Sequence, residues 1–453
     1  MTATSASRGT WGSRLGFVLA AAGSAIGLGN IWKFPIETAE NGGAAFVFVY
    51  LICVLSIGIP VMLAELAVGR KTGSNPVGAF KKLMPGSAWK MVGGLGVVTG
   101  VMILSAYAVV AGWILKYIWF AVSGTLSGMG ADEIGAVFTA STSSGWQSIL
   151  LLLFFLVLTA GVVAGGVQGG IERASRMLMP ALFLLLLLLC IRSVTLPGAA
   201  AGISFYLKPD FGKIDFTVIM AALGQAFFSL SLGMGTMITY GSYMRKEDDL
   251  AVSTAAVCLL DSAVAIIAGF MIFPALFSGG VDPLAGPGLI FVVLPHIFNN
   301  IPFGQLFSAF FFFLVAIAAL TSTISLLEVP VAYFVDERGW SRRKAAWLVA
   351  LGAFLIGIPS ALSNGAVAAL TDFRSGFMGE VFNWFGEFSL VIGGLALCIF
   401  VGYRWGLKPA IEEIRQGSAE FFATGLWGFM IRYGCPAAIA GILVSRYILP
   451  MFG

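Results

Sequence analysis

One acidic residue stands inside a long apolar stretch of this sequence. Asp261 lies in CLLDSAVAIIAGF and has no other charged residue in that stretch. A carboxylate at the centre of a bilayer costs at least about 2.5–3.5 kcal/mol on insertion scales, and such residues usually serve ion or substrate binding. A purely structural role is the alternative. Asp261 is therefore the first candidate for a functional residue.

Glycines interrupt two apolar stretches at matching places in the two halves of the chain. The interruptions are GSAIGLGN at 23–30 and SLSLGMG at 229–235. Unwound backbone in lipid is tolerated only where it lines a cavity or finds partners. Freed carbonyl oxygens suit a hard cation such as sodium, and a freed helix N-terminus suits a carboxylate. Close packing through small residues would explain one break, whereas two in matching halves favour a transporter with a midplane site.

Cysteine and histidine give little support for catalysis or metal binding. The five cysteines lie in apolar runs without a CxxC pair, and the single histidine is His296. No disulfide framework or metal site is readable from them. An enzyme would need a nucleophile–base pair or metal ligands at membrane depth, and a channel would need pore loops or rings of like charge. A receptor or scaffold would not need two broken helices, so a transporter is favoured over all three.

Composition indicates the elements that position these residues. Of 453 residues, 58% are apolar and 11% are charged, whereas soluble domains are about a quarter charged. Apolar runs of the roughly 20 residues that cross a bilayer recur along the chain, and the short alternating strands of a membrane β-barrel are not seen. Because the basic residues stand in short loops between these runs, we expect a lipid bilayer around the protein and no nucleic-acid partner.

The pattern predicts an all-α integral membrane protein with about eleven transmembrane helices. They are expected near 12–35, 42–68, 88–122, 146–166, 174–195, 217–244, 251–276, 303–334, 343–361, 367–403 and 423–449. A short re-entrant or surface helix is expected at 285–300. The chain 1–453 is interpreted as one transporter domain. Its first repeat is 11–195, its second is 217–403, and helix 11 is 423–449.

Loop charges predict the orientation in the membrane. Lysine and arginine concentrate in every second loop, as in KKLMPG at 81–86 and RGWSRRK at 338–344, and the loops between carry few. The positive-inside rule then places the N-terminus in the cytoplasm and, after eleven helices, the C-terminus outside. We expect a multi-pass protein of the plasma membrane.

Long segments resemble the neurotransmitter:sodium symporter family. They are RGTWGSRLGFVLAAAGSAIGLGNIWKFP, AENGGAAFVFVY, GIPVMLAELAVGR, GQAFFSLSLGMGTMITYGSYMRK and AALTSTISLLEVPVAYFVDE. The resemblance covers nearly the whole chain and is closest to the bacterial amino-acid branch, which includes leucine and multi-hydrophobic-amino-acid transporters. It implies inverted five-helix repeats with broken helices 1 and 6. The family normally has twelve helices, one more than expected here.

The resemblance implies two sodium ions. The first site would use Ala25, Asn30, Ser229 and Asp261, and the second Gly23, Ile26, Ala318, Thr321 and Ser322. Their oxygens suit a hard cation, although a threonine or serine alone could simply bond to its own helix. The family usually has asparagine at Asp261 and obtains a negative charge from bound chloride or from a carboxylate one turn later, at Ala265 here. We therefore expect transport without chloride.

The resemblance also implies a substrate pocket. Its residues would be Ser24, Ala25, Gly27, Gly29, Ile103, Tyr107, Phe228, Ser229, Ser231, Met234, Thr323 and Leu326. Tyr107 would bind the substrate carboxylate, and the remaining side chains are mostly apolar. Flexible Met234 suits varied shapes. The expected substrates are hydrophobic L-amino acids including tryptophan, phenylalanine and leucine, although core packing would explain any one of these residues.

Two gates are implied in the same way. Lys33 and Asp372 match the extracellular ion pair of the family, above an aromatic lid of Phe228 and Tyr107; Arg8 and Asp336 match the cytoplasmic pair, beside Trp11 and Tyr243. Glu65 is expected to hold backbone near the break in helix 1 or 6. Gly170 and Pro180 bracket the start of helix 5, which either unwinds to admit water or is a loop followed by an N-terminal helix proline.

Overall fold

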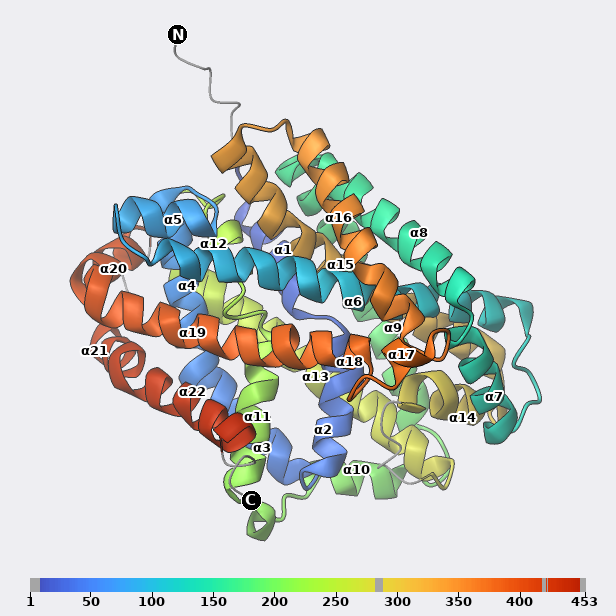
Figure 1. Cartoon of the computed structure of the whole chain (residues 1–453). Coiled ribbons are helices and arrows are strands. Elements are labelled where there is room, and N and C mark those ends of the chain that lie inside the picture. The colour runs from blue at the N-terminus through green and yellow to red at the C-terminus, as the bar shows by residue number, and fades with distance from the viewer. Residues whose placement is uncertain (1–8, 282–287, 418–420, 422, 449–453) are drawn as a thin grey trace.

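The computed structural model describes residues 9–281, 288–417, 421 and 423–448, and within these ranges every regular element is a helix. Among the described residues, nine helices are long and apolar enough to cross a membrane, and Arg14–Ala25 with Gly29–Glu40 forms a tenth span that bends by 50°. Phe216–Ser229 and Thr236–Gly241 are the two parts of another broken span. The described part of the chain therefore contains all eleven predicted helices. Figure 1 shows how they are arranged.

The first half of the chain forms five spans. Their α-helical parts are α1 (Arg14–Ala25), α2 (Phe34–Glu40), α3 (Ala44–Cys53), α4 (Ile59–Thr72), α6 (Lys90–Ser123), α8 (Gly145–Ala164) and α9 (Arg173–Val194). Three helices that the sequence did not predict lie between or after them: α5 (Pro76–Leu83), α7 (Ala131–Thr142) and α10 (Ala199–Leu207). They lie outside the long apolar runs, so hydropathy gave no signal for them.

The second half forms six spans. Its α-helices are α11 (Phe216–Ser229), α12 (Thr236–Gly241), α13 (Leu250–Ser278), α14 (Leu294–Asn299), α15 (Gly304–Arg338), α16 (Arg342–Leu362), α17 (Ala368–Thr371), α18 (Phe377–Val381), α19 (Ser389–Ile399), α20 (Leu407–Arg415), α21 (Thr424–Phe429) and α22 (Cys435–Leu443). Short π-helical segments join several of these. The predicted helix at 285–300 lies partly outside the described residues, and its described part contains α14 after the π-helical Leu289–Val293.

The predicted tenth helix, 367–403, was placed wrongly at both ends. The span runs over Phe377–Arg415, while α17 is a separate turn before it. Arg374 and Gly376 have φ of 51° and 78°, a left-handed backbone that ends a helix. At the other end the helix continues past the first arginines, because Ala410 and Ile414 are buried.

Long central helices position the two broken ones. α6 packs along α15, and α1 lies against α13 and α15. At 34 and 35 residues, α6 and α15 are each about 50 Å long, which exceeds the roughly 30 Å of bilayer hydrocarbon. Outer helices such as α8 and α9 expose Phe154 and Leu184, as lipid-facing helices do. The polar breaks of spans 1 and 6 are thus enclosed by protein.

Candidate functional site

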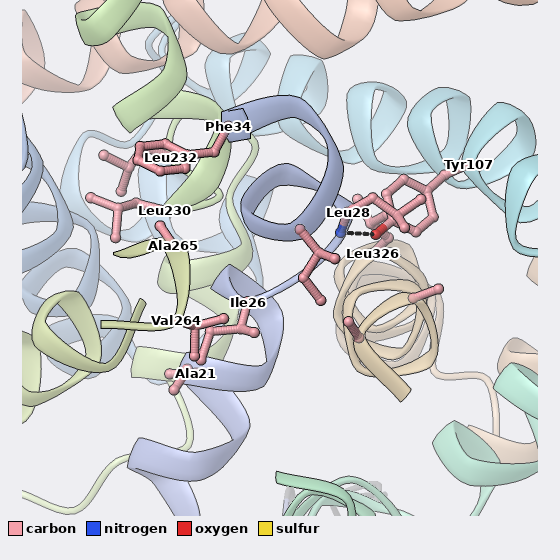
Figure 2. Packing of buried hydrophobic residues seen from close by; sticks show 14 of the residues in the cluster. Ala21, Ile26, Leu28, Phe34, Tyr107, Leu230, Leu232, Val264, Ala265 and Leu326 are labelled. Atoms are coloured by element: carbon pink, nitrogen blue, oxygen red, sulfur yellow. Dashed lines mark hydrogen bonds between the residues drawn. The ribbon is translucent and has the colours of Figure 1, made fainter. Parts of the chain in front are cut away.

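The first span unwinds between Ala25 and Gly29. Ile26 has an extended conformation, with φ −74° and ψ 103°. Figure 2 shows the chain crossing from Ile26 to Leu28 without a helical turn, and the Leu28 N–H donates to the Tyr107 hydroxyl at 3.0 Å. The Gly27 N–H donates to Asn30 Oδ1 at 3.1 Å. Side chains therefore bind the backbone donors that the break releases, and one of these partners is the tyrosine expected to bind substrate.

The sixth span unwinds between Ser229 and Thr236. Ser231, Gly233 and Gly235 have φ of 54°, 81° and 78°. Left-handed backbone is unusual for serine and costs roughly 1–2 kcal/mol. The Ser231 hydroxyl donates to the Ser24 carbonyl at 3.1 Å, which joins the two breaks. The Gly233 N–H donates to Glu65 Oε1 at 2.7 Å. Glu65, expected at one of the breaks, thus holds the sixth.

A cavity of about 40 Å³ lies between the two breaks. Its lining includes ten of the predicted pocket residues: Ser24, Ala25, Gly27, Gly29, Ile103, Tyr107, Phe228, Ser231, Met234 and Leu326. Ser322, Ser325 and Leu390 also line it, although Ser325 and Leu390 were not predicted. This volume holds only a few water molecules. A hydrophobic amino acid would therefore need the surrounding side chains to move apart.

Two predicted pocket residues are absent from this lining. The Thr323 hydroxyl lies 2.9 Å from that of Thr159 on α8, so its role as a pocket residue stays a prediction. Consecutive residues of a helix point about 100° apart, and Ser322 and Ser325 face the cavity instead. Ser229 lies behind the cavity, where its hydroxyl donates to both oxygens of Asp261 at 2.9 Å.

Asp261 is the centre of a buried polar cluster. Its carboxylate accepts hydrogen bonds from Asn30 Nδ2 at 2.8 Å, from Ser229 and from the Tyr50 hydroxyl at 3.2 Å. Asp261 and Asn30 are both fully shielded from solvent. The structure therefore brings together three of the four residues predicted for the first sodium site, and the fourth, Ala25, is the last residue of α1 before the break. Tyr50 was missed, although a tyrosine in an apolar helix needs a hydrogen-bond partner.

The residues predicted for the second sodium site lie where α1 meets α15. A Cβ atom on Gly23 would lie 3.2 Å from Thr321 Cβ and 3.1 Å from Met179 Sδ. Ser322 donates to the Ser24 carbonyl at 3.4 Å. The Thr321 hydroxyl contacts the carbonyls of Ile317 and Ala318, both at 3.1 Å, so bonding to its own helix remains an alternative. Ile26 is buried at the break, beside Val264 in Figure 2.

The outer ion pair differs from the predicted one. Lys33 Nζ lies 2.9 Å from Glu387 Oε1, and Arg446 contacts the other oxygen of Glu387 at 2.9 Å. The Lys33 ammonium also lies 4.7 Å from the centre of the Phe228 ring. Asp372 is exposed at the end of α17, before the span begins, so the predicted Lys33–Asp372 pair was wrong. Between this cluster and Tyr107 lies a second cavity of about 240 Å³.

The residues predicted for the cytoplasmic gate include two buried aromatic side chains, Trp11 and Tyr243. Trp11 Nε1 donates to the Tyr240 carbonyl at 2.9 Å, and the Trp11 N–H donates to the Tyr243 carbonyl at 3.1 Å. Asp336 accepts hydrogen bonds from the backbone and side chain of Asn75, at 2.8 and 3.1 Å. Arg8 lies outside the described residues, so its pair with Asp336 stays a prediction.

The start of span 5 contacts the segment before α1. Residues Val167–Glu172 are π-helical, and Glu172 Oε2 accepts the Gly12 N–H at 2.7 Å. A Cβ on Gly170 would lie 2.0 Å from the Val162 carbonyl, so glycine is required there. Pro180 lies inside α9, which excludes the alternative of an N-terminal helix proline. The start of this span is π-helical, and its unwinding stays a prediction.

Comparisons with a family model, with curated proteins and with solved structures all indicate the same protein family. The model of the sodium:neurotransmitter symporter family matches residues 8–132 and 133–450. An uncharacterized sodium-dependent transporter of Bacillus subtilis is 41% identical over 96% of this chain and 97% of its own. The human sodium- and chloride-dependent GABA transporter 2 is 31% identical over 90% of this chain and 75% of its own. The crystal structure of MhsT in complex with L-phenylalanine is similar with a TM-score of 0.90 and 44% identity, over 97% of this chain and 100% of that one.

Proposed function

The chain belongs to the sodium:neurotransmitter symporter family, and from this premise we propose that it imports hydrophobic L-amino acids together with sodium ions. As a family member it is a sodium-dependent membrane transporter, not an enzyme. The observation that carries the proposal is the cavity between the two broken spans, which combines polar backbone with apolar side chains. The phenylalanine bound to MhsT supports an amino acid as substrate.

The chemistry of the cavity suits the two parts of such a substrate. Its carboxylate would lie at the N-terminal end of the helix that starts at Gly29, where the helix dipole favours an anion. The Tyr107 hydroxyl, which accepts the Leu28 N–H, can donate its own proton to that carboxylate. Its side chain would contact Ile103, Met234 and Leu326. These apolar residues favour aliphatic and aromatic substrates, such as leucine, phenylalanine and tryptophan, over charged ones.

We propose that two sodium ions bind to oxygen atoms around the break in span 1. The first site would use Asn30, Ser229, Asp261 and the Ala25 carbonyl, with the substrate carboxylate as a further ligand. The second site would use the carbonyls of Gly23, Ile26 and Ala318 and the hydroxyls of Thr321 and Ser322. Carboxylate, amide, hydroxyl and carbonyl oxygens are the donors that hard cations prefer, and the buried Asp261 carboxylate supports a cation at the first site.

We further propose that chloride is not required. Two sodium ions in a low-dielectric site need compensating negative charge, and Asp261 supplies one fixed charge among Asn30, Ser229 and Tyr50. The position one helical turn later is Ala265, which is buried and apolar. The negative charge that some relatives obtain from bound chloride would thus be supplied by the Asp261 carboxylate of this chain.

Alternating access would open the outer and inner closures in turn. Lys33, Glu387 and Arg446 would separate on the outer side, and the contacts of Trp11 would break on the inner side. The bias of basic residues supports a plasma-membrane orientation with the N-terminus in the cytoplasm and the C-terminus outside.

Binding of radiolabelled L-phenylalanine to the purified protein tests this proposal. The same assay is run in sodium chloride and in choline chloride, with leucine, valine, tryptophan, glutamate, lysine and GABA as competitors. We expect saturable binding only in sodium, with displacement by the hydrophobic amino acids. Equal affinity in choline would refute sodium coupling, and stronger competition by glutamate, lysine or GABA would refute the substrate class.

A further inference from the structure

An arginine of the last span has no acidic partner among the residues that the structure describes. Arg432 lies within the apolar span Thr424–Tyr447. Its Nε and Nη2 donate to the Gly402 carbonyl at 3.2 and 3.0 Å, and its guanidinium lies 5.4 Å from the centre of the Tyr403 ring. The ion pairs among the described residues do not include it. A charge in an apolar span is costly unless an opposite charge or water compensates it.

Two other arginines at this end of the bundle are compensated. Arg70 pairs with the buried Glu413 at 2.9 Å, and Arg342 pairs with the buried Glu328 at 2.5 Å. The carboxylate is fully buried in both pairs, whereas the Arg70 side chain is fully buried and the Arg342 side chain is partly exposed. Arg432 differs because it borders an open groove, so its counter-charge can come from outside the chain.

The groove beside Arg432 has a volume of about 320 Å³. It lies between α20 and α21, which are neighbours at one edge of the molecule (Figure 1). Leu407, Ile411 and Phe429 give it apolar walls, and Arg432 and Thr424 contribute polar groups. Gly425 also lines it, and a Cβ atom there would meet nothing within 4 Å. The missing side chain leaves room for a ligand that is mainly hydrocarbon.

The surroundings are typical of a membrane–water interface. Arg404, Lys408 and Tyr403 are exposed on the neighbouring span, and the Tyr403 hydroxyl donates to the Arg432 carbonyl at 2.7 Å, so Arg432 lies at the same level. Tyrosine and basic residues gather at this level of the bilayer. Among the described residues of α20, the exposed acid is Glu412, and the three cations Arg404, Lys408 and Arg432 stand near this groove.

We propose that this groove binds one anionic phospholipid, with the phosphate on Arg432 and an acyl chain along Leu407, Ile411 and Phe429. Basic pockets between transmembrane helices bind acidic lipid headgroups through such charge complementarity. The guanidinium can donate to a phosphate oxygen while it keeps its bonds to the Gly402 carbonyl. This lipid would hold α21 against the end of the preceding span.

Thermal unfolding of the delipidated full-length protein in detergent tests the proposal. The additions are phosphatidylglycerol, phosphatidylcholine with the same acyl chains, and inorganic phosphate, and native mass spectrometry counts bound lipids. We expect phosphatidylglycerol to raise the unfolding temperature more than phosphatidylcholine, and inorganic phosphate to have no such effect. Arg432→Gln should weaken phosphatidylglycerol binding by about fivefold.

Two further variants separate the lipid site from general effects on folding. Gly425→Leu fills the groove without changing charge, so it should also remove the preference for phosphatidylglycerol. Arg343→Gln, an exposed arginine on α16, should keep that preference. Equal responses to the two lipids, an equal response to inorganic phosphate, or an unchanged preference in both Arg432→Gln and Gly425→Leu would overturn the proposal. Sodium-dependent phenylalanine binding is measured in parallel. Its outcome tests the proposed transport function and does not bear on the lipid site.

Discussion

The two candidate sodium sites flank the same broken helix but differ in charge. The first contains Asp261, whose carboxylate accepts hydrogen bonds from Asn30, Ser229 and Tyr50. The second consists of hydroxyl groups and carbonyls around Gly23 and Thr321, and none of its predicted residues is charged. A fixed anion in a low-dielectric site attracts a cation far more strongly than neutral dipoles do. We infer that the first site holds its ion more tightly.

The two candidate sodium sites also differ in the residues that surround them. The first cluster lies among Tyr50, Ala265 and other fully buried residues. The second lies against Met179 on α9, and the π-helical start of that span is irregular. We infer that this irregular start is the part of the protein that would rearrange to release an ion from the second site.

Removing the charge of the first site should have the largest effect. We expect Asp261→Asn to raise the sodium concentration for half-maximal phenylalanine binding by about 10- to 100-fold, because the cation loses a full negative charge nearby. Binding is measured against sodium titration at constant ionic strength. Asp372→Asn is the matched control, because Asp372 is exposed and should leave the titration unchanged. A variant that titrates like the unmodified protein would remove the distinction between the sites.

The contact between Glu172 and the segment before α1 should control access to the second site. Glu172→Gln weakens a charged hydrogen bond to the Gly12 N–H, and loss of such a bond costs about 1.5–3 kcal/mol. We expect hydrogen exchange of residues 9–25 in sodium to become about tenfold faster. Glu337→Gln, which breaks a partly exposed pair with Lys81, is the control. Unchanged exchange in Glu172→Gln would show that this contact does not hold the inner side closed.

Removing one neutral ligand of the second site should have a smaller effect than removing the charge of the first. Thr321→Val deletes a single hydroxyl, worth about 1 kcal/mol, so sodium dependence should weaken by about fivefold. Thr323→Val is a close control, since that hydroxyl faces Thr159. If Thr323→Val weakened sodium dependence and Thr321→Val did not, the proposal that Thr321 rather than Thr323 faces the second sodium site would be wrong.

Breaking the ion pair between Lys33 and Glu387 should have the smallest effect on substrate binding. Lys33 and Glu387 are both partly exposed, and such pairs contribute at most about 1 kcal/mol. Lys33→Gln should therefore change phenylalanine affinity by less than about fivefold. Glu387→Gln should have the larger effect of the two, since Glu387 also pairs with Arg446. Equal or reversed effects in a competition assay would argue against a role for Arg446.

Features that depend on local composition could be predicted from the sequence. The spans follow from apolar runs, and the breaks follow from glycine in GSAIGLGN and SLSLGMG. Asp261 was identifiable because a charge inside an apolar span needs a partner. Its neighbours Asn30 and Ser229 came from the family resemblance and lie in hydrogen-bonding contact with it in the structure.

Features that depend on helix phase or on exact helix ends could not be predicted. Thr321, Ser322 and Thr323 are three successive hydroxyl residues, and sequence alone does not say which of them faces the cavity. The partner of Lys33 depended on where span 10 begins, which the left-handed backbone at Arg374 and Gly376 decides. Arg446 comes from a different span, more than fifty residues further along the chain than Asp372, so no local pattern connects it with Lys33.

Uptake by reconstituted proteoliposomes tests the central claim most directly. Radiolabelled L-phenylalanine is supplied with an inward gradient of sodium chloride, sodium gluconate or choline chloride. The account predicts equal concentrative uptake with the two sodium salts and none with choline, because sodium drives transport and Asp261 replaces chloride. Uptake that persists in choline chloride, or that stops in sodium gluconate, would contradict it.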